Sequence, residues 1–236
     1  MKATTGTCRQ YHGTARQHLN KMNQIAIDLN NRGVQALERG DSVSAFQAFS
    51  KAANITMVLI ENHRHISSGA HSFQFHWINC DHPSLLLRKE GCAPFLFLRA
   101  LTISSPRCGN HQVNNLCPCG FAWAIWFNLA LCCSILGTKL GEKGRLFMEM
   151  AHDLYGKVQR RVESEPPSRH WQMLAMAISN NQACIFSELS MQQASLECLK
   201  RLAVALSSCK EIEVEDRGDF CLNLQILGSQ TIAAAA

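Results

Sequence analysis

The chain has 236 residues, of which 47% are hydrophobic and 17% are charged, and its formal net charge is +5. This balance supplies enough apolar side chains for a buried core, so it excludes a disordered chain and a coiled coil. Lys and Arg form no dense cluster along the sequence, and we therefore expect no nucleic-acid partner and no membrane partner.

The stretch from Met1 to Gln10 contains no apolar run of the kind that forms a signal peptide, and we predict an N-terminal tail at 1–21. The chain has twelve cysteines, which we expect to be reduced thiols in an intracellular, cytoplasmic protein. The longest apolar run, Phe121 to Leu136, is shorter than the roughly 20 residues that a membrane span needs. It is predicted to be a buried helix.

Residues 22–57 are predicted to form a first helix pair. Apolar residues recur at helical spacing from Ile25 to Gly40, and the second helix runs from about Val43 to Ile55. The sequence Gly40-Asp41-Ser42 between them is typical of one helix ending and the next being capped.

Two further helix pairs are predicted at 121–162 and 171–208, separated by a linker at 163–170. In the second pair, a loop from Thr138 to Gly144 precedes a helix from Arg145 to Arg161. The linker contains two prolines, which break a helix, and Ser168, which can cap the next one.

An insertion at 58–120 separates the first two pairs and has a strand-like pattern. Apolar and polar residues alternate from Ser72 to Cys80, and the run from Pro94 to Ile103 is apolar and rich in β-forming residues. Phe220 to Leu227, within a C-terminal region at 209–236, alternates in the same way and is predicted as a third strand, followed by a frayed tail from Thr231 to Ala236. We therefore expect a small antiparallel sheet packed against the helices.

The spacing of small residues within the helix pairs resembles the tetratricopeptide repeat. The first pair reads Leu29-x2-Arg32-Gly33-x2-Ala36 and then Ala45-x3-Phe49-x2-Ala52, and the other two pairs keep parts of this pattern. Gly33 and Ala45 lack bulk, so the two helices can approach closely while Phe49 fills the groove beside them. The expected fold is mostly α, a TPR-like antiparallel helix-pair array with a small antiparallel β insertion.

The order of segments along the chain also resembles a group of TPR-like proteins with a β insertion. The resemblance depends on four short stretches, namely Asn31–Gly33, Phe75–Trp77, Phe97–Ala100 and Cys117–Trp123. It implies the architecture and no activity.

An asparagine stands two residues before the small residue in each pair, as Asn31, Asn128 and Asn181. A carboxamide can both donate a hydrogen bond to a peptide backbone and accept one, so these residues could hold an extended segment without reading its side chains. Alternatively, each asparagine bridges neighbouring helices by bonding their backbone carbonyls.

The resemblance implies that the first helices of the pairs line a concave groove that binds an extended peptide or partner segment. Arg32 and Arg201 occupy positions that normally face the helix interface, so a carboxylate clamp is not expected. The predicted groove residues are Asn30, Asn31, Val34, Leu37, Glu38, Phe127, Asn128, Leu131, Asn180, Asn181, Cys184 and Ser187.

The alternative hypothesis is a zinc-binding or thiol-dependent module centred on Cys117-Pro118-Cys119. Candidate ligands are present nearby, but only Cys117 and Cys119 are close in sequence, whereas a structural zinc site normally uses two pairs of ligands. The ligand candidates are Cys80, His82, Cys92, Cys108, His111, Cys117 and Cys119.

A catalytic thiol would need a depressed pKa, and Cys119 at a helix start is the candidate, with His76, His82 or His111 as its base. No phosphate loop, dinucleotide fingerprint, serine elbow or HExxH motif is present. We therefore expect a non-catalytic protein without a cofactor or a metal. The four tryptophans stand in apolar patterns and are predicted to pack in the core.

Overall fold

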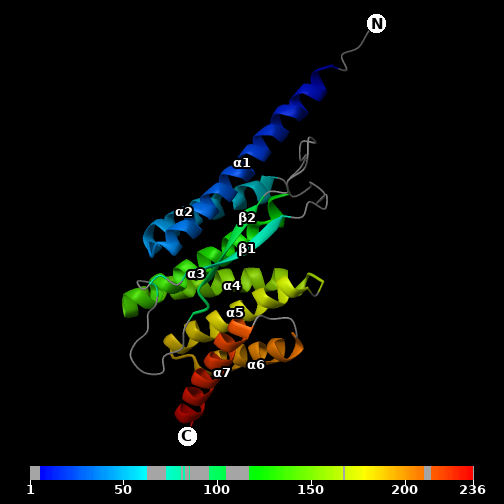
Figure 1. Ribbon diagram of the computed structural model, residues 1–236. Coiled ribbons are helices and arrows are strands. Elements are labelled where there is room, and N and C mark those ends of the chain that lie inside the picture. The colour runs from blue at the N-terminus through cyan, green and yellow to red at the C-terminus, as the bar shows by residue number, and fades with distance from the viewer. Residues whose placement is uncertain are drawn as a thin grey trace.

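The computed structural model describes residues 6–62, 73–80, 82, 85, 96–104, 117–166, 168–209 and 214–235. Within these ranges the chain is mostly helical, with one small sheet (Figure 1). In chain order the elements are α1 (Gly6–Glu38), α2 (Ser42–Asn62), β1 (Gln74–Asn79), β2 (Arg99–Ser104), the 3-10 turn η1 (Pro118–Gly120), α3 (Ala122–Leu140), the 3-10 turn η2 (Gly141–Gly144), α4 (Arg145–Glu163), α5 (Arg169–Glu188), α6 (Gln192–Ser208) and α7 (Val214–Ala235).

The three predicted helix pairs are confirmed as α1 with α2, α3 with α4, and α5 with α6. The pairs follow one another in space, because α2 packs on α3 and α4 packs on α5, while α7 covers α5 and α6. In the first turn, Gly40 has a positive φ of 77°, and Asp41 Oδ1 accepts a hydrogen bond from Ser44 N at 2.9 Å. The predicted helix end and cap therefore form as expected.

The close crossing of α1 and α2 depends on Gly33. A Cβ atom added there would lie 2.5 Å from Cε1 of Phe49, whose side chain is fully buried, as is that of Ala45. The small residues therefore have the packing role predicted for them.

In the second pair, α3 is buried along nearly its whole length, as predicted for Phe121 to Leu136. Every residue from Ala122 to Gly137 is buried except Trp126, which is half-buried. The predicted loop from Thr138 to Gly144 is wrong, because α3 continues to Leu140 and η2 fills the remainder. This tight connection requires glycine, since a Cβ atom at Gly144 would collide with the backbone carbonyl of Gly137.

The insertion contains the predicted strand pair. β1 and β2 form a two-stranded antiparallel sheet in which Phe75 lies opposite Ile103 and Trp77 lies opposite Leu101. The predicted third strand is wrong, because Phe220 to Leu227 lies within α7. Phe220 and Asn223 are buried three residues apart, which is the spacing of one helix face.

Both ends of the described chain are more helical than the sequence suggests. The predicted N-terminal tail at 1–21 is helical from Gly6 onward, and Figure 1 shows this part of α1 extending beyond the rest of the molecule. Most of the predicted frayed tail from Thr231 to Ala236 belongs to α7.

Candidate functional site

The three recurrent asparagines lie at equivalent positions of α1, α3 and α5 and face one extended segment. We call the surface that carries Asn31, Asn128 and Asn181 the asparagine face. It is covered by residues 97–103, which include most of β2, and Figure 1 shows the two strands running alongside α3. The asparagines thus come together across three helix pairs, as their common register predicts.

Each asparagine bonds both backbone groups of a single residue in this segment. Asn31 accepts from Ile103 N at 2.9 Å and donates to Ile103 O at 2.9 Å, and Asn128 makes the same two bonds to Leu101 at 2.8 Å each. Asn181 accepts from Phe97 N at 2.7 Å and donates to Phe97 O at 3.4 Å. The carboxamides therefore bond the segment as a neighbouring β-strand would.

The alternating direction of the backbone N–H and C=O groups explains why the asparagines bond only odd-numbered residues of the segment. In an antiparallel pair, residues alternate between those that bond the partner strand and those whose N–H and C=O point to the opposite edge. Cys80 N donates to Leu98 O at 2.8 Å, so the backbone groups of the even-numbered residues of the segment point toward β1. The N–H and C=O groups of Phe97, Leu101 and Ile103 point to the opposite edge, toward the helices.

A second set of amides links the asparagines to one another and to the core. Asn128 Nδ2 donates to Asn30 Oδ1 at 2.8 Å, and Asn30 Nδ2 donates to Leu101 O at 2.9 Å. At the other end, Asn223 Nδ2 on α7 donates to Asn180 Oδ1 at 2.7 Å.

Asn180 in turn donates to Asn181, and Asn181 Nδ2 donates to the hydroxyl of Tyr155 at 2.9 Å. Burial raises the pKa of Tyr155 and outweighs its hydrogen bonds, so this hydroxyl remains neutral in the network.

The segment bonds four of the predicted groove residues, Asn30, Asn31, Asn128 and Asn181, through their carboxamides. At these positions the chain's own strand lies where the resemblance implies a bound partner segment. Asn31 and Ser187 are half-buried, and Glu38 is exposed. The nine buried positions are Asn30, Val34, Leu37, Phe127, Asn128, Leu131, Asn180, Asn181 and Cys184.

The alternative role for the asparagines, bridging neighbouring helices through backbone carbonyls, is not what the structure shows. Their backbone partners are residues of the insertion. Sequence reasoning missed Phe97, Leu101 and Ile103 as site residues, although it identified the run that contains them as a strand. The apolar, β-prone character of that run was the available signal.

An aromatic layer holds the hairpin against α3 and α5. Trp77 packs edge-on against Phe127 at 5.6 Å between ring centroids, and Phe75 lies 4.4 Å from Trp123. The ring of His170, at the start of α5, stacks on Phe75 at 5.6 Å. Nε2 of His170 is buried without a hydrogen-bond partner among the described residues, and burial lowers the pKa of this imidazole.

The tryptophans pack as predicted. Trp123 is buried, while Trp77, Trp126 and Trp171 are half-buried and lie against the core.

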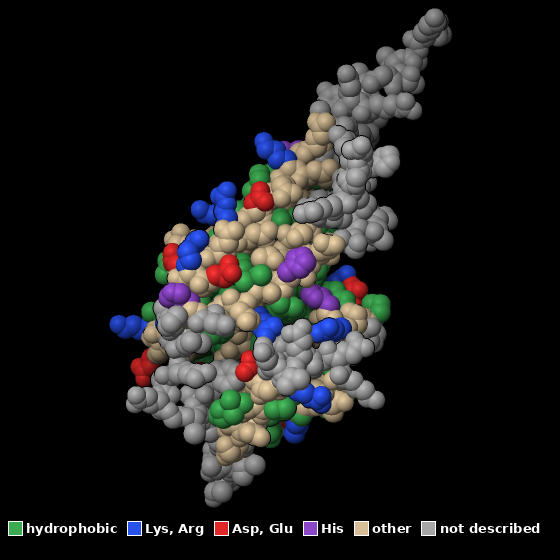
Figure 2. Space-filling view, viewed as in Figure 1, with side chains coloured by type: hydrophobic (Ala, Val, Ile, Leu, Met, Phe, Trp, Pro, Cys, Tyr) green, Lys and Arg blue, Asp and Glu red, His purple; other side chains and the backbone are tan. Residues whose placement is uncertain are grey.

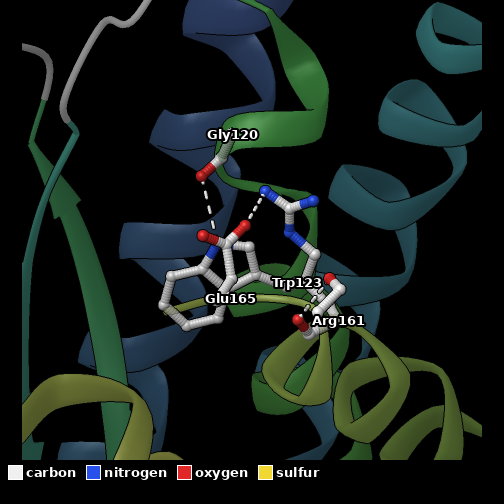
Figure 3. A network of polar contacts seen from close by, with 5 residues as sticks. Gly120, Trp123, Arg161 and Glu165 are labelled. Atoms are coloured by element: carbon white, nitrogen blue, oxygen red, sulfur yellow. Dashed lines mark hydrogen bonds and ion pairs between the residues drawn. The ribbon is translucent and has the colours of Figure 1, made fainter. Parts of the chain in front are cut away.

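Cys117 directly precedes η1 and Cys119 lies within it, and Cys119 is close to Arg161 near the end of α4. Figure 3 shows the surrounding contacts: Trp123 Nε1 donates to Gly120 O at 3.1 Å, and Arg161 pairs with Glu165. Burial raises the pKa of the Cys119 thiol, and the neighbouring Cys117 raises it further. Cys119 therefore lacks the depressed pKa that a catalytic thiol would need, because desolvation opposes the thiolate form.

The described residues contain no group of three His, Cys, Asp or Glu side chains arranged to hold a metal ion. Cys80 is buried and its thiol donates to Ile78 O at 3.7 Å, while His82 is exposed. The other candidates, Cys92, Cys108 and His111, lie outside the described residues.

A separate hollow of about 570 Å³ lies between α4, α5 and α6. Arg201 Nη2 donates there to Gln182 Oε1 at 3.3 Å and to Cys198 Sγ at 3.0 Å, so this arginine serves the helix interface as predicted. Arg160 and Glu163 also line the hollow, and its charges are of both signs.

In the part of the chain that the structure describes, neither the distribution of charged side chains nor the length of the apolar helices indicates a nucleic-acid or membrane site. On the face shown in Figure 2, Lys and Arg side chains are dispersed among Asp and Glu. Ser42–Asn62 and Ala122–Glu163 are long and apolar enough to cross a membrane by length and composition alone. One or two such helices are weak evidence, and 72% of the apolar window in the second stretch is buried inside the protein, as in a core helix, against 33% in the first.

Comparison of the sequence and the structure with protein-family models, curated proteins and solved structures gives no match. The resemblance to tetratricopeptide proteins therefore depends on the spacing within the helix pairs and on the order of segments along the chain.

Proposed function

We propose that this chain is a non-catalytic protein-interaction module, a TPR-like array whose asparagine face binds an extended protein segment by its backbone. The observation that supports this function is the pairing of Asn31, Asn128 and Asn181 with both backbone groups of Ile103, Leu101 and Phe97 in one segment. Contacts of this kind depend on an extended backbone and not on a particular side chain.

In the present state, the chain itself supplies that segment. A tethered segment competes at an effective concentration on the order of millimolar, so a free partner binds only when the hairpin leaves or when its own segment binds more tightly. The hairpin thus acts as an internal occupant that keeps the asparagine face closed. The proposal keeps the expected cytoplasmic location and involves no cofactor, nucleic acid or membrane.

The test uses a full-length variant in which the segment no longer fits. Leu101→Asp with Ile103→Asp places two carboxylates at positions that are at most 1% exposed in the wild type, so their desolvation drives β2 off the asparagine face. We call this variant the opened chain. Circular dichroism first establishes that its helices persist. Fluorescence anisotropy then measures its binding to a panel of labelled extended peptides.

We expect at least one extended peptide to bind the opened chain and not the wild type. Binding should be lost when Asn128→Ala is added, and it should survive Asn54→Ala, a matched change on the exposed face of α2. A helical opened chain that binds none of the peptides, or binding that is indifferent to Asn128→Ala, would contradict the proposal.

A further inference from the structure

We infer that the partner segment has the side-chain pattern of residues 97–103, with an aromatic residue first, a small residue fourth, and branched apolar residues fifth and seventh. This inference depends on the proposed function, because it treats the internal occupant as a copy of the ligand. The partner class is then a β-prone apolar strand of another protein. The four positions differ from the rest of the segment in burial and surroundings.

The first position requires an aromatic ring. Phe97 is 3% exposed, and its ring stacks on Phe220 of α7 at 4.8 Å with 25° between the planes. Trp77 meets the same ring edge-on at 5.9 Å. An aliphatic side chain would lose both ring contacts, whereas another aromatic residue keeps them.

The fifth and seventh positions require branched apolar side chains. Leu101 is fully buried and Ile103 is 1% exposed, and the pairing register places them beside Trp77 and Phe75 on the face that packs against α3. A charged or polar side chain at either position would be desolvated among aromatic rings.

The fourth position excludes bulk. Ala100 is fully buried on the opposite face of the strand, so a larger side chain there has no solvent to enter and must displace the core. By contrast Leu98, Arg99 and Thr102 are half-buried and should tolerate change.

The backbone adds one further rule. The N–H groups of Phe97, Leu101 and Ile103 each donate to an asparagine oxygen, so proline is excluded at these three positions. Methylation of the Leu101 nitrogen removes the same donor without altering the side chain.

The experiment measures binding of the opened chain to a labelled peptide with the sequence of residues 96–104, flanked by lysines for solubility. We expect at least a tenfold loss of affinity for peptides carrying Ala100→Leu, Leu101→Asp or the N-methyl group at Leu101. Thr102→Val is the matched control at a tolerant position and should change affinity less than threefold.

A scrambled peptide separates this inference from the proposed function. If it binds as tightly as the matched peptide, the pattern is wrong while backbone binding stands. If neither these peptides nor the wider panel binds the folded opened chain, both proposals fail.

If the opened chain does not fold, hydrogen exchange on the wild type decides. The matched peptide, supplied well above the roughly millimolar effective concentration of the tethered segment, should accelerate exchange of the Leu101 and Ile103 amides, and the scrambled peptide should not. Equal exchange with both peptides, or no acceleration with the matched one, would overturn the inference.

Discussion

Replacing Asn128 by alanine should destabilise the protein by about 2–6 kcal/mol, because it leaves two buried polar groups without partners. Leu101 N loses its acceptor, and Asn30 Oδ1 loses its donor, each at 2.8 Å in the wild type. Leu101 O is protected from this loss, since Asn30 Nδ2 also donates to it at 2.9 Å. Each orphaned group contributes about 1–3 kcal/mol, and Asn128 is fully buried, so water cannot replace the lost bonds.

Urea unfolding measures this loss as a change in the free energy of unfolding, and hydrogen exchange at the Leu101 amide locates it. Asn54→Ala, on the exposed face of α2, is the matched control and should shift the free energy by no more than about 0.5 kcal/mol. A loss below about 1 kcal/mol, with the Leu101 amide still protected, would refute the reasoning that the carboxamide holds the strand.

Three further predictions concern packing and pH. Gly33→Ala should destabilise the protein by about 1–3 kcal/mol in a thermal melt, because the added Cβ would lie 2.5 Å from the buried ring of Phe49. The control Gly218→Ala meets nothing within 4 Å in α7 and should instead stabilise the protein by up to about 1 kcal/mol. His170→Phe should become progressively more stable than the wild type as pH falls from 7 to 5. The folded pKa of His170 is lowered, so its neutral form contributes stability that is present above the unfolded pKa and lost on acidification. A constant difference between the melting midpoints of the two proteins would contradict this. Asn128→Asp should be least stable at neutral pH and should regain stability in acid. A carboxylate facing Leu101 O and Asn30 Oδ1 must be protonated to remain buried. A melting midpoint that does not change with pH would count against that arrangement.

The local features of the fold could be predicted because local physics determines them. Helical periodicity located the pairs, the lack of bulk at Gly33 indicated the crossing of α1 and α2, and alternation of side chains identified β1 and β2. The common register of Asn31, Asn128 and Asn181 indicated a surface suited to backbone binding. Apart from that register, which compares the three pairs, each of these signals lies within about one helix pair.

The occupant of that surface could not be predicted for a different reason. Asn31 bonds Ile103 across 72 residues of sequence, and a carboxamide pairs equally well with the backbone of any extended residue except proline. Such a contact leaves no complementary pattern in the sequence that could be matched to the asparagines. Only the fold reveals that the strand in the insertion reaches the asparagine face.

The helix α7 was misread because two periodicities coincide in it. Phe220, Leu222 and Leu224 alternate as in a strand, but Phe220 and Asn223 are the fully buried residues while Leu222 is 47% exposed. The inward face of the helix is marked by a polar residue, and Asn223 is accommodated there because it donates to Asn180. A hydrophobic pattern cannot detect a helix face of this composition.

The arrangement also determines what a competing partner must provide. A two-stranded hairpin is marginal on its own, and here the outer edge of residues 97–103 is completed by the carboxamides of three helices. Exchange of this segment for a foreign strand would conserve those backbone bonds, so they favour neither occupant. Tethering favours the internal segment. A foreign strand can therefore displace the internal segment only through the side chains that it places at the positions of Phe97, Leu101 and Ile103. These positions are buried, and the asparagines, which bond the backbone, do not contribute to their side-chain preference.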